Sequence, residues 1–271
     1  MSYPQKLKTP SDFCWVELMT SHHKGVKNFY GSFLNWTFHE EELPDQRLFT
    51  MISSKDAPIG GLFDISEELR NLKLSPRWLS YVRIQNLDQS LAAVQALGGE
   101  IVRGPLSIPN AGRMAWVEDP VHSLFALWEA QDSYGSLLDQ RAVYAPGWRE
   151  LITAEEDLAS PFYETVFGWE ARQTSIEWDG TKIPYTCFFL EDRPIAGLMK
   201  PSKEMTSSHP LWLVHFNVPD CNKTVEICKK NGGTLVSPVT YFPKRGQIAT
   251  LRDPYGAVFA VSAYSSEITE P

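Results

Sequence analysis

No hydrophobic run in this 271-residue sequence approaches the ~18 residues that a membrane-spanning helix needs, although apolar residues make up 43% of it. The first residues, Met-Ser-Tyr-Pro-Gln-Lys, lack the apolar stretch of a signal peptide. We therefore expect a cytoplasmic protein with no membrane partner. Basic clusters are also missing, and a net charge of −8 would repel a phosphate backbone, so nucleic acid is not an expected partner.

Motifs with a recognisable chemistry are scarce as well. The four cysteines, Cys14, Cys187, Cys221 and Cys228, contain no Cys-x-x-Cys pair, which favours reduced structural thiols over a disulfide or zinc framework. There is no glycine-rich phosphate loop, no Gly-x-Ser-x-Gly elbow and no His-Glu-x-x-His sequence. These absences remove P-loop nucleotide hydrolysis, serine hydrolase and zinc protease chemistry from the candidate functions.

An internal repeat is the strongest feature that is present. Several groups of residues recur in the same order, 133 to 136 positions apart. The pairs are Phe29-Tyr30 with Phe162-Tyr163, Trp36 with Trp169, Pro58-Ile59-Gly60-Gly61-Leu62 with Pro194-Ile195-Ala196-Gly197-Leu198, Gly98-Gly99 with Gly232-Gly233, and Asp119-Pro120 with Asp253-Pro254. A drift of three residues indicates that the two halves share one fold, with small insertions confined to loops.

Each half divides again into two similar units. Residues 13–20 read as a strand, with Ser21 as a candidate helix N-cap. The next residues place apolar side chains at i, i+3, i+4 and i+7, the spacing of an amphipathic helix; these are Val26, Phe29, Tyr30 and Phe33. The pattern restarts near residue 79 and occurs twice more in the second half. The sequence therefore predicts an α+β fold of four β-α-β-β-β modules.

The chain length supports a two-domain organisation. We expect a first domain over residues 8–130, a linker over 131–147 and a second domain over 148–265. The linker is polar and contains Gly135, Pro146 and Gly147. Because each half exceeds 120 residues, we expect each to bury a core of its own.

This ordered set of residues, occurring twice, resembles the vicinal oxygen chelate superfamily, which includes glyoxalases, bleomycin-resistance proteins and extradiol dioxygenases. The segments 15–20 and 112–115 are similar to its duplicated, two-domain glyoxalase-like hydroxylase branch. The resemblance covers roughly residues 10–265. It implies that two modules pair edge to edge and curl into a cup-shaped cleft, whose floor holds a divalent metal in the enzymes.

Strand alternation predicts which side chains face those clefts. In the first strand, Cys14, Val16 and Leu18 form an apolar face for the helix, which leaves Trp15, Glu17 and Met19 on the other face. The same register brings Tyr81 and Arg83 to the first cleft and Trp148, Glu150, His215 and Asn217 to the second. The candidate catalytic residues are Glu17, Glu150 and His215. The candidate ligand contacts are Trp15, Tyr81, Arg83, Trp148 and Asn217.

Structural roles compete with these assignments. Glu17 and Glu150 could serve only as ion-pair partners, and a half-buried histidine is more often a satisfied core residue than a base. Two observations favour function: the glutamates occupy equivalent positions 133 residues apart, and a carboxylate close to His215 could fix the tautomer of its imidazole.

The metal ligands that the resemblance implies are missing from their usual positions. The residues there are Trp15, Leu79, Trp148, Leu213, Ala126 and Ala260, none of which binds a metal. A shift of two residues would recruit Glu150 and His215, but two ligands fall short of the three expected at a catalytic site. We therefore predict no cofactor, with a divalent metal at Glu150 and His215 as the alternative.

Three functions fit these observations. The first is binding of a small, partly apolar organic molecule in the clefts without a metal, by a monomer or a homodimer. The second is a metal-dependent lyase or isomerase, similar to lactoylglutathione lyase, or a dioxygenase. The third is metal-free acid–base catalysis, in which Glu150 or Glu17 removes a proton next to a carbonyl group and Arg83 or His215 stabilises the oxyanion.

Overall fold

The computed structural model describes residues 11–42, 48–64, 74–131, 140–178, 180–203, 205, 209–243 and 245–264. Residues 132–139 of the predicted linker lie outside these ranges, so the domain boundaries remain a prediction. None of the helices in the described part of the chain is long and apolar enough to cross a membrane.

The described residues form four β-α-β-β-β modules, which confirms the predicted α+β class. The first module comprises β1 (Phe13–Thr20), α1 (His23–Leu34), β2 (Trp36–Glu42), β3 (Leu48–Ser54) and β4 (Ala57–Asp64). The second comprises β5 (Arg77–Ile84), α3 (Leu87–Ala96), β6 (Glu100–Ile108), β7 (Gly112–Glu118) and β8 (Leu124–Ala130). The third comprises β9 (Pro146–Ile152), α4 (Glu156–Phe167), β10 (Glu170–Trp178), β11 (Thr181–Leu190) and β12 (Arg193–Met199). The fourth comprises β13 (Leu211–Asn217), α5 (Cys221–Lys230), β14 (Thr234–Phe242), β15 (Gly246–Arg252) and β16 (Val258–Ala263).

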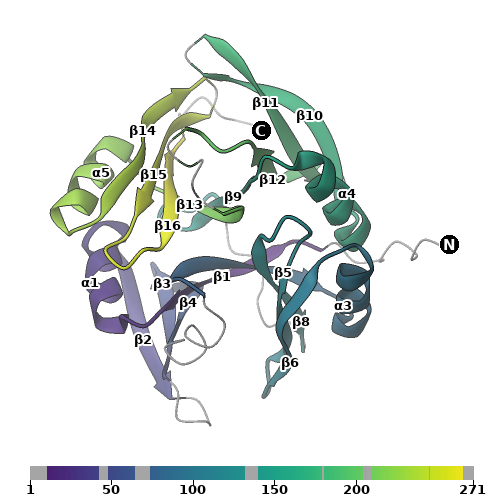
Figure 1. Ribbon diagram of the computed structural model, residues 1–271. Helices are drawn as coiled ribbons and strands as arrows, with labels where there is room; N and C mark the ends of the chain where they lie inside the picture. The colour runs from purple at the N-terminus through teal and green to yellow at the C-terminus, as the bar shows by residue number, and fades with distance from the viewer. Residues whose placement is uncertain are drawn as a thin grey trace.

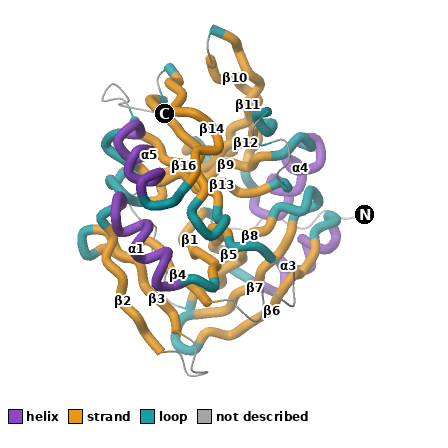
Figure 2. The backbone as a smooth tube through the Cα atoms, turned by 60° about the vertical axis from the view of Figure 1, so that its left-hand side comes forward, coloured by secondary structure: helices purple, strands orange, loops and turns teal. Residues whose placement is uncertain are grey.

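Consecutive modules share one sheet, as the resemblance implies. The first sheet has the strand order β2-β3-β4-β1-β5-β8-β7-β6, and the second repeats it as β10-β11-β12-β9-β13-β16-β15-β14. In each sheet the first strands of the two modules pair antiparallel at the centre. Figures 1 and 2 show both sheets curled, with the helices along the sides of the molecule. The central strands β1, β5, β9 and β13 therefore place alternate side chains on the face opposite the helices.

Local sequence explains where the helices begin. Asn86 and Asp220, 134 residues apart, cap α3 and α5 by accepting hydrogen bonds from the backbone N–H groups of Gln89 and Lys223. The predicted cap at Ser21 is wrong by one residue, because His22 occupies the N-cap position and its side chain makes no capping bond. Pro161 lies inside α4, in its second turn.

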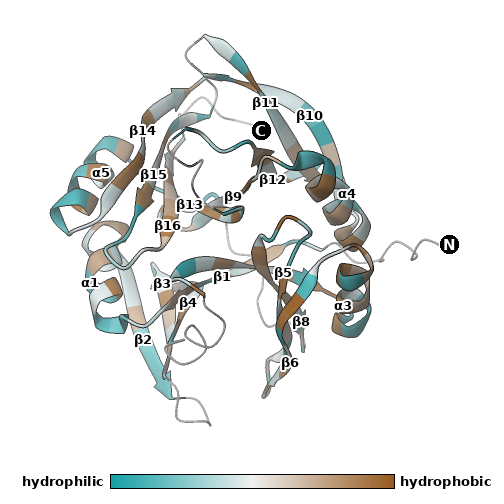
Figure 3. Cartoon of the chain, viewed as in Figure 1, coloured by the Kyte–Doolittle hydropathy of each residue, from teal (hydrophilic) through white to brown (hydrophobic). Residues whose placement is uncertain are grey.

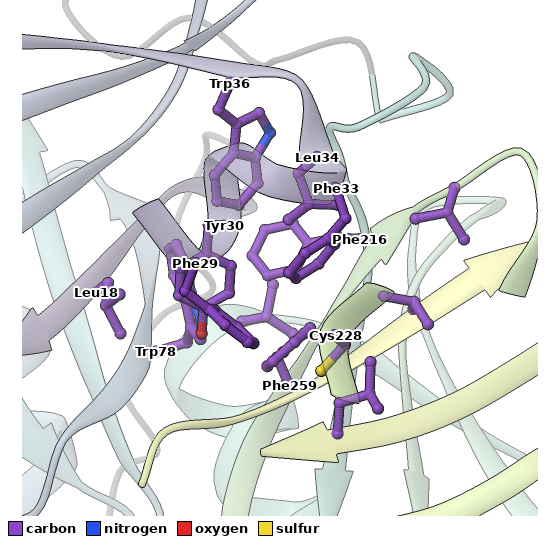
Figure 4. Close-up of a cluster of buried hydrophobic side chains, with 14 of the residues drawn as sticks. Leu18, Phe29, Tyr30, Phe33, Leu34, Trp36, Trp78, Phe216, Cys228 and Phe259 are labelled. Atoms are coloured by element: carbon purple, nitrogen blue, oxygen red, sulfur yellow. The ribbon is translucent and has the colours of Figure 1, made fainter. Parts of the chain in front are cut away.

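The two largest core clusters join the two halves, whereas smaller clusters lie within a single half. The expectation that each half buries a core of its own is therefore met only by the smaller clusters. One core cluster combines α1 of the first module with β13, α5 and β16 of the fourth. Figure 4 shows Phe29 and Tyr30 beside Phe216 and Phe259 in this cluster. The other core cluster combines the second module with the third. Accordingly α1 packs against α5, and α3 against α4 (Figure 1).

Periodicity alone could not reveal this arrangement. It identifies the apolar face of each helix, and Figure 3 shows hydrophobic and hydrophilic segments alternating along the helices. It does not identify the element that covers that face. Here each helix turns part of its apolar stripe toward a module of the other half, so neither half completes its core alone.

Paired hydrogen-bond chains reinforce the contact between the halves. Tyr163 of α4 donates to Asp119 Oδ2 in the β7–β8 turn at 2.6 Å, and accepts from Trp212 Nε1 at 2.7 Å. The equivalent residues repeat the chain. Tyr30 donates to Asp253 Oδ2 at 3.1 Å and accepts from Trp78 Nε1 at 3.0 Å. Each Asp-Pro turn is thereby tied to a helix of the opposite half.

One strand assignment needs correction. Val16 and Leu18 pack on the helix side as predicted, but Cys14 packs on the opposite face with Met19, Tyr81 and other apolar side chains. The register between β1 and β5 shifts between Phe13 and Trp15, which marks a bulge at Cys14. The bulge interrupts the two-residue alternation, so Phe13 rather than Cys14 contributes to the core beneath the helices.

Candidate functional site

The faces opposite the helices carry the candidate sites. We call this face of the β1–β8 sheet the first cup and that of the β9–β16 sheet the second cup. Glu17 on β1 and Glu150 on β9 occupy the centres of the two cups and are 7% and 8% exposed, respectively. On the neighbouring parallel strand, Gly61 lies opposite Glu17 and Gly197 lies opposite Glu150. The repeat therefore brings two buried carboxyl groups to equivalent positions.

The second cup encloses a cavity of about 80 Å³ to which strands of both its modules contribute. Its walls are mainly apolar and include Ile152, Ile176, Met199, Met205, Leu213, Phe242 and Ile248. Its charged or titratable lining residues are Glu150, Lys200, His215 and Arg245. The cavity is therefore an apolar chamber with a few convergent polar groups, the usual character of a small-molecule site.

Glu150 and His215 meet at this cavity. The carboxylate Oε2 lies 3.5 Å from His215 Nε2, a distance at which a protonated imidazole forms an ion pair. The contact lacks the geometry of a hydrogen bond, because Nε2 has no hydrogen-bond partner among the described residues. His215 Nδ1 lies 3.0 Å from Ser262 Oγ, which fixes the orientation of the ring. The predicted proximity of Glu150 and His215 is thus present in the structure.

A tyrosine completes the surroundings of Glu150. Tyr185 on β11 donates a 3.0 Å hydrogen bond to Glu150 Oε1 and accepts one from Trp148 Nε1 at 3.2 Å. A Cβ atom added to Gly197 would lie only 1.7 Å from the hydroxyl oxygen of Tyr185. A side chain at Gly197 would therefore displace the tyrosine from the carboxylate.

The charges around Glu150 determine its protonation. Burial alone would raise the pKa of this carboxyl group. The interaction with His215, the hydroxyl of Tyr185 and the charge of Arg245 outweigh that effect, so the pKa lies below its ordinary value of 4.5. Glu150 is therefore ionised at neutral pH and can accept a hydrogen bond or a proton from a ligand.

Glu17 in the first cup has a different environment. Tyr81 donates a 2.5 Å hydrogen bond to Glu17 Oε2, and Trp15 pairs with Tyr81 across the antiparallel strands. Burial raises the pKa of Glu17 to about 7, despite the opposing effects of Tyr81 and the charge of Arg103. The equivalent carboxyl groups thus have pKa values on opposite sides of the ordinary one.

One difference at an equivalent position contributes to these opposite pKa shifts. Tyr81 of the first cup corresponds to His215 of the second, since they are 134 residues apart and pair with Ala126 and Ala260. A neutral phenol beside Glu17 gives one hydrogen bond, whereas an imidazole beside Glu150 can also carry positive charge.

Three other predicted site residues do not line the second cavity: Asn217, Trp148 and Arg83. Asn217 does not line the second cavity, which corrects the prediction. Its Nδ2 donates to the backbone oxygens of Gln140 at 2.8 Å and Ala142 at 2.9 Å, so it holds the segment that precedes β9. Trp148 contacts Tyr185 but is also not among the lining residues. Arg83 is half-buried beside Trp128, two residues beyond Tyr81.

Sequence reasoning missed three residues of the second cup. Tyr185 lies on the third strand of its module, at the position equivalent to Phe49. The two-residue spacing of Tyr185 and Cys187 could have indicated that both face the second cup. Ser262 faces His215 from the last strand. Arg245 precedes β15, where no periodic pattern indicates the direction of a side chain.

A divalent metal fits these residues poorly. The described part of the chain contains no group of three or more His, Cys, Asp or Glu side chains that could hold a metal ion. Glu150 and His215 offer two ligands, and the equivalent pair in the first cup replaces the imidazole with a phenol. Catalytic sites for such metals ordinarily use three protein ligands.

Comparisons with known proteins agree with the fold. Residues 150–261 match the family described as the glyoxalase/bleomycin resistance protein/dioxygenase superfamily. A protein named putative glyoxylase CFP32 from Mycobacterium bovis is 27% identical over 249 residues, spanning 91% of this chain and 92% of the relative. A variant of 4-hydroxymandelate synthase from Streptomyces coelicolor superposes with a TM-score of 0.61 at 12% identity, covering 96% of this chain and 94% of that one. The Mn(II)-bound glyoxalase from Novosphingobium aromaticivorans gives a TM-score of 0.56 at 14% identity, covering 94% and 83%, respectively.

Proposed function

We propose that this chain is a member of the vicinal oxygen chelate superfamily and that its second cup binds a small, partly apolar organic molecule without a resident metal. The observation that carries the proposal is the contact of Glu150 with His215 at the wall of an apolar cavity. Burying two ionisable side chains is costly unless they gain partners or a function. A polar ligand group gives this pair a partner, while the apolar walls supply contact area.

The cavity size limits what enters it. An engineered protein cavity of about 150 Å³ holds benzene, whereas this cavity measures about 80 Å³. We propose that it receives one end of the ligand and that the rest extends toward the rim, where Lys200 is exposed. The proposal includes a cytoplasmic location, in line with the four free cysteines, because reduced thiols are usual there.

A cavity-filling substitution tests the binding function. We would screen a library of small aromatic and aliphatic carbonyl compounds by NMR against the wild type and the Met199→Trp variant. Ligands should perturb the wild type and lose at least tenfold in affinity in the variant, because the indole occupies the cavity. Met114→Trp, a matched change on the first sheet, should retain binding. An unchanged affinity in Met199→Trp would place the ligand elsewhere.

The alternative of a metal-dependent lyase, isomerase or dioxygenase rests on the superfamily, in which one superposing structure is described as Mn(II)-bound. If this chain held such an ion, Glu150 and His215 would be two of its ligands, and the ion would polarise a ligand oxygen. Elemental analysis of the purified protein distinguishes metal-free binding from a metal-dependent enzyme. About one tightly held equivalent of divalent ion, released by Glu150→Gln, would replace our proposal with this one.

A second candidate function is metal-free acid–base catalysis. It is favoured by the ionised Glu150 beside an oriented imidazole, and by the pKa of Glu17, which is close to neutral pH. Proton removal next to a carbonyl group can be followed as deuterium exchange at C3 of 2-oxobutyrate. Under this hypothesis Glu150→Gln slows exchange by ~10²-fold or more if the second cup acts. Exchange that persists in the Glu17→Gln, Glu150→Gln double variant would remove both carboxylates from the mechanism.

A further inference from the structure

We infer that the ligand of the second cup is an organic monoanion and that Arg245 holds its anionic group. This inference deepens the proposed function and rests on it. It concerns a residue that strand periodicity does not identify, since Arg245 precedes β15 rather than lying within a strand.

Arg245 lines the cavity and is half-buried. The central carbon of its guanidinium group lies 4.3 Å from the centroid of the Tyr185 ring, so one face of the group rests on an aromatic surface. Tyr185 in turn donates its hydroxyl hydrogen to Glu150. The arginine is therefore positioned by a side chain that also belongs to the carboxylate site.

No ion pair within 4.0 Å joins Arg245 to a carboxylate of the described residues. Its guanidinium rests on the ring of Tyr185 and also interacts with the hydroxyl of that tyrosine. Glu150 is near enough to influence Arg245 electrostatically, yet it is paired with His215 instead. The edges of the planar guanidinium, which carry five N–H donors, suit a carboxylate that binds through both oxygens.

The charge balance of the cavity favours an anion. Among the described residues that line the cavity, Glu150 is the one carboxylate, whereas Arg245 and, at the rim, Lys200 are two cations. This local balance is opposite to the net charge of −8 for the whole chain, so it does not follow from composition. A half-buried cation facing apolar walls is stabilised when an anion fills the space.

The walls determine the rest of the ligand. Ile152, Met199 and Leu213 surround the same cavity and provide no hydrogen-bonding group from their side chains. A ligand that satisfies both Arg245 and these walls carries a single anionic group on an apolar body. Small aromatic or branched aliphatic carboxylates have this character.

Three probes of similar shape and different charge test the inference at pH 7. Benzoate, benzamide and benzylammonium are titrated against the folded protein by NMR, and each dissociation constant is measured. We expect the wild type to bind benzoate at least tenfold more tightly than benzamide, and benzylammonium most weakly. In Arg245→Gln the benzoate preference should fall below threefold, while the affinity for benzamide stays within twofold.

Two further variants keep the result interpretable. Arg245→Lys retains the charge without the planar fork and should show an intermediate preference, even if Arg245→Gln folds poorly. Arg252→Gln, an exposed position in the same sheet, should behave as the wild type. Equal binding of benzoate and benzamide by the wild type overturns the anion inference and leaves the binding function intact. Binding of none of the probes overturns both.

Discussion

Tyr163 in the second half donates a 2.6 Å hydrogen bond to Asp119 in the first half, and both groups are buried. Asp119 also accepts hydrogen bonds from the backbone N–H groups of Val121 and Ser123, so one carboxylate organises a turn and contacts the other half. The bond between Tyr30 and Asp253 is its counterpart. Side chains at the ends of the β-hairpins therefore help to hold the halves in register.

Removing one hydroxyl group measures the contribution of this contact. Tyr163→Phe deprives Asp119 of a donor and Trp212 of an acceptor in a buried site. We expect the free energy of unfolding to fall by about 1–3 kcal/mol, because buried polar groups are left without partners. Urea denaturation followed by tryptophan fluorescence gives the value. Tyr241→Phe, at a residue that is 60% exposed, should change it by less than about 0.5 kcal/mol.

The shared cores predict that the halves are not independent. Limited proteolysis should cut first within residues 131–147, yet the two fragments should elute together in size-exclusion chromatography, because each of the two largest core clusters contains residues of both. The halves expressed separately should aggregate, and co-expression should restore the soluble complex. Separate elution of two folded, monomeric fragments would contradict the shared-core arrangement.

The two glutamates should respond to pH with opposite signs. The raised pKa of Glu17 means that its contribution to stability is complete below its ordinary pKa of 4.5 and is lost as pH rises toward about 7. The lowered pKa of Glu150 means that its contribution is present above 4.5 and is lost as pH falls through its lower folded pKa. Because glutamine does not titrate, each Glu→Gln variant is the reference with which the stability of the wild type is compared at each pH.

Urea denaturation between pH 4 and 8 makes the comparison. Relative to Glu17→Gln, the wild type should lose up to about 3 kcal/mol between pH 4.5 and 8, at ~1.36 kcal/mol for each unit of pKa shift. Relative to Glu150→Gln, the wild type should lose stability only on acidification below pH 4.5. Parallel profiles for the two variants would show that the cups do not differ in protonation.

Two glycines should respond to alanine in opposite ways. Gly197→Ala places a methyl group against the Tyr185 hydroxyl, and we expect a loss of about 1–3 kcal/mol as the ring is displaced. Gly31→Ala, in α1, meets only Phe38 at an ordinary 3.5 Å and should add about 0.5–1 kcal/mol of helix stability. Thermal unfolding of both variants tests the pair. An unchanged Tyr185 position in a crystal structure of Gly197→Ala would contradict the steric argument.

The repeated features of the sequence predicted much of the fold. The offsets of 133 to 136 predicted the repeated modules, the family resemblance implied their pairing in one sheet, and alternation along β9 and β13 placed Glu150 near His215. Prediction from the sequence failed at Cys14, where a bulge breaks the alternation. It also missed Arg245, because the direction of a side chain next to a turn depends on the tertiary fold. The contact of each helix with the opposite half was invisible, since amphipathic patterns do not name their partners.

The pairing of the first module with the fourth also governs how the chain can fold as it is synthesised. The apolar side chains of α1 meet residues of β16, more than 200 positions later. The part of this apolar surface that the fourth module covers stays exposed until almost the whole chain has left the ribosome, because contacts between distant residues form late. The emerging first half is therefore the form most exposed to aggregation, and chaperones would act on it before the last strand arrives.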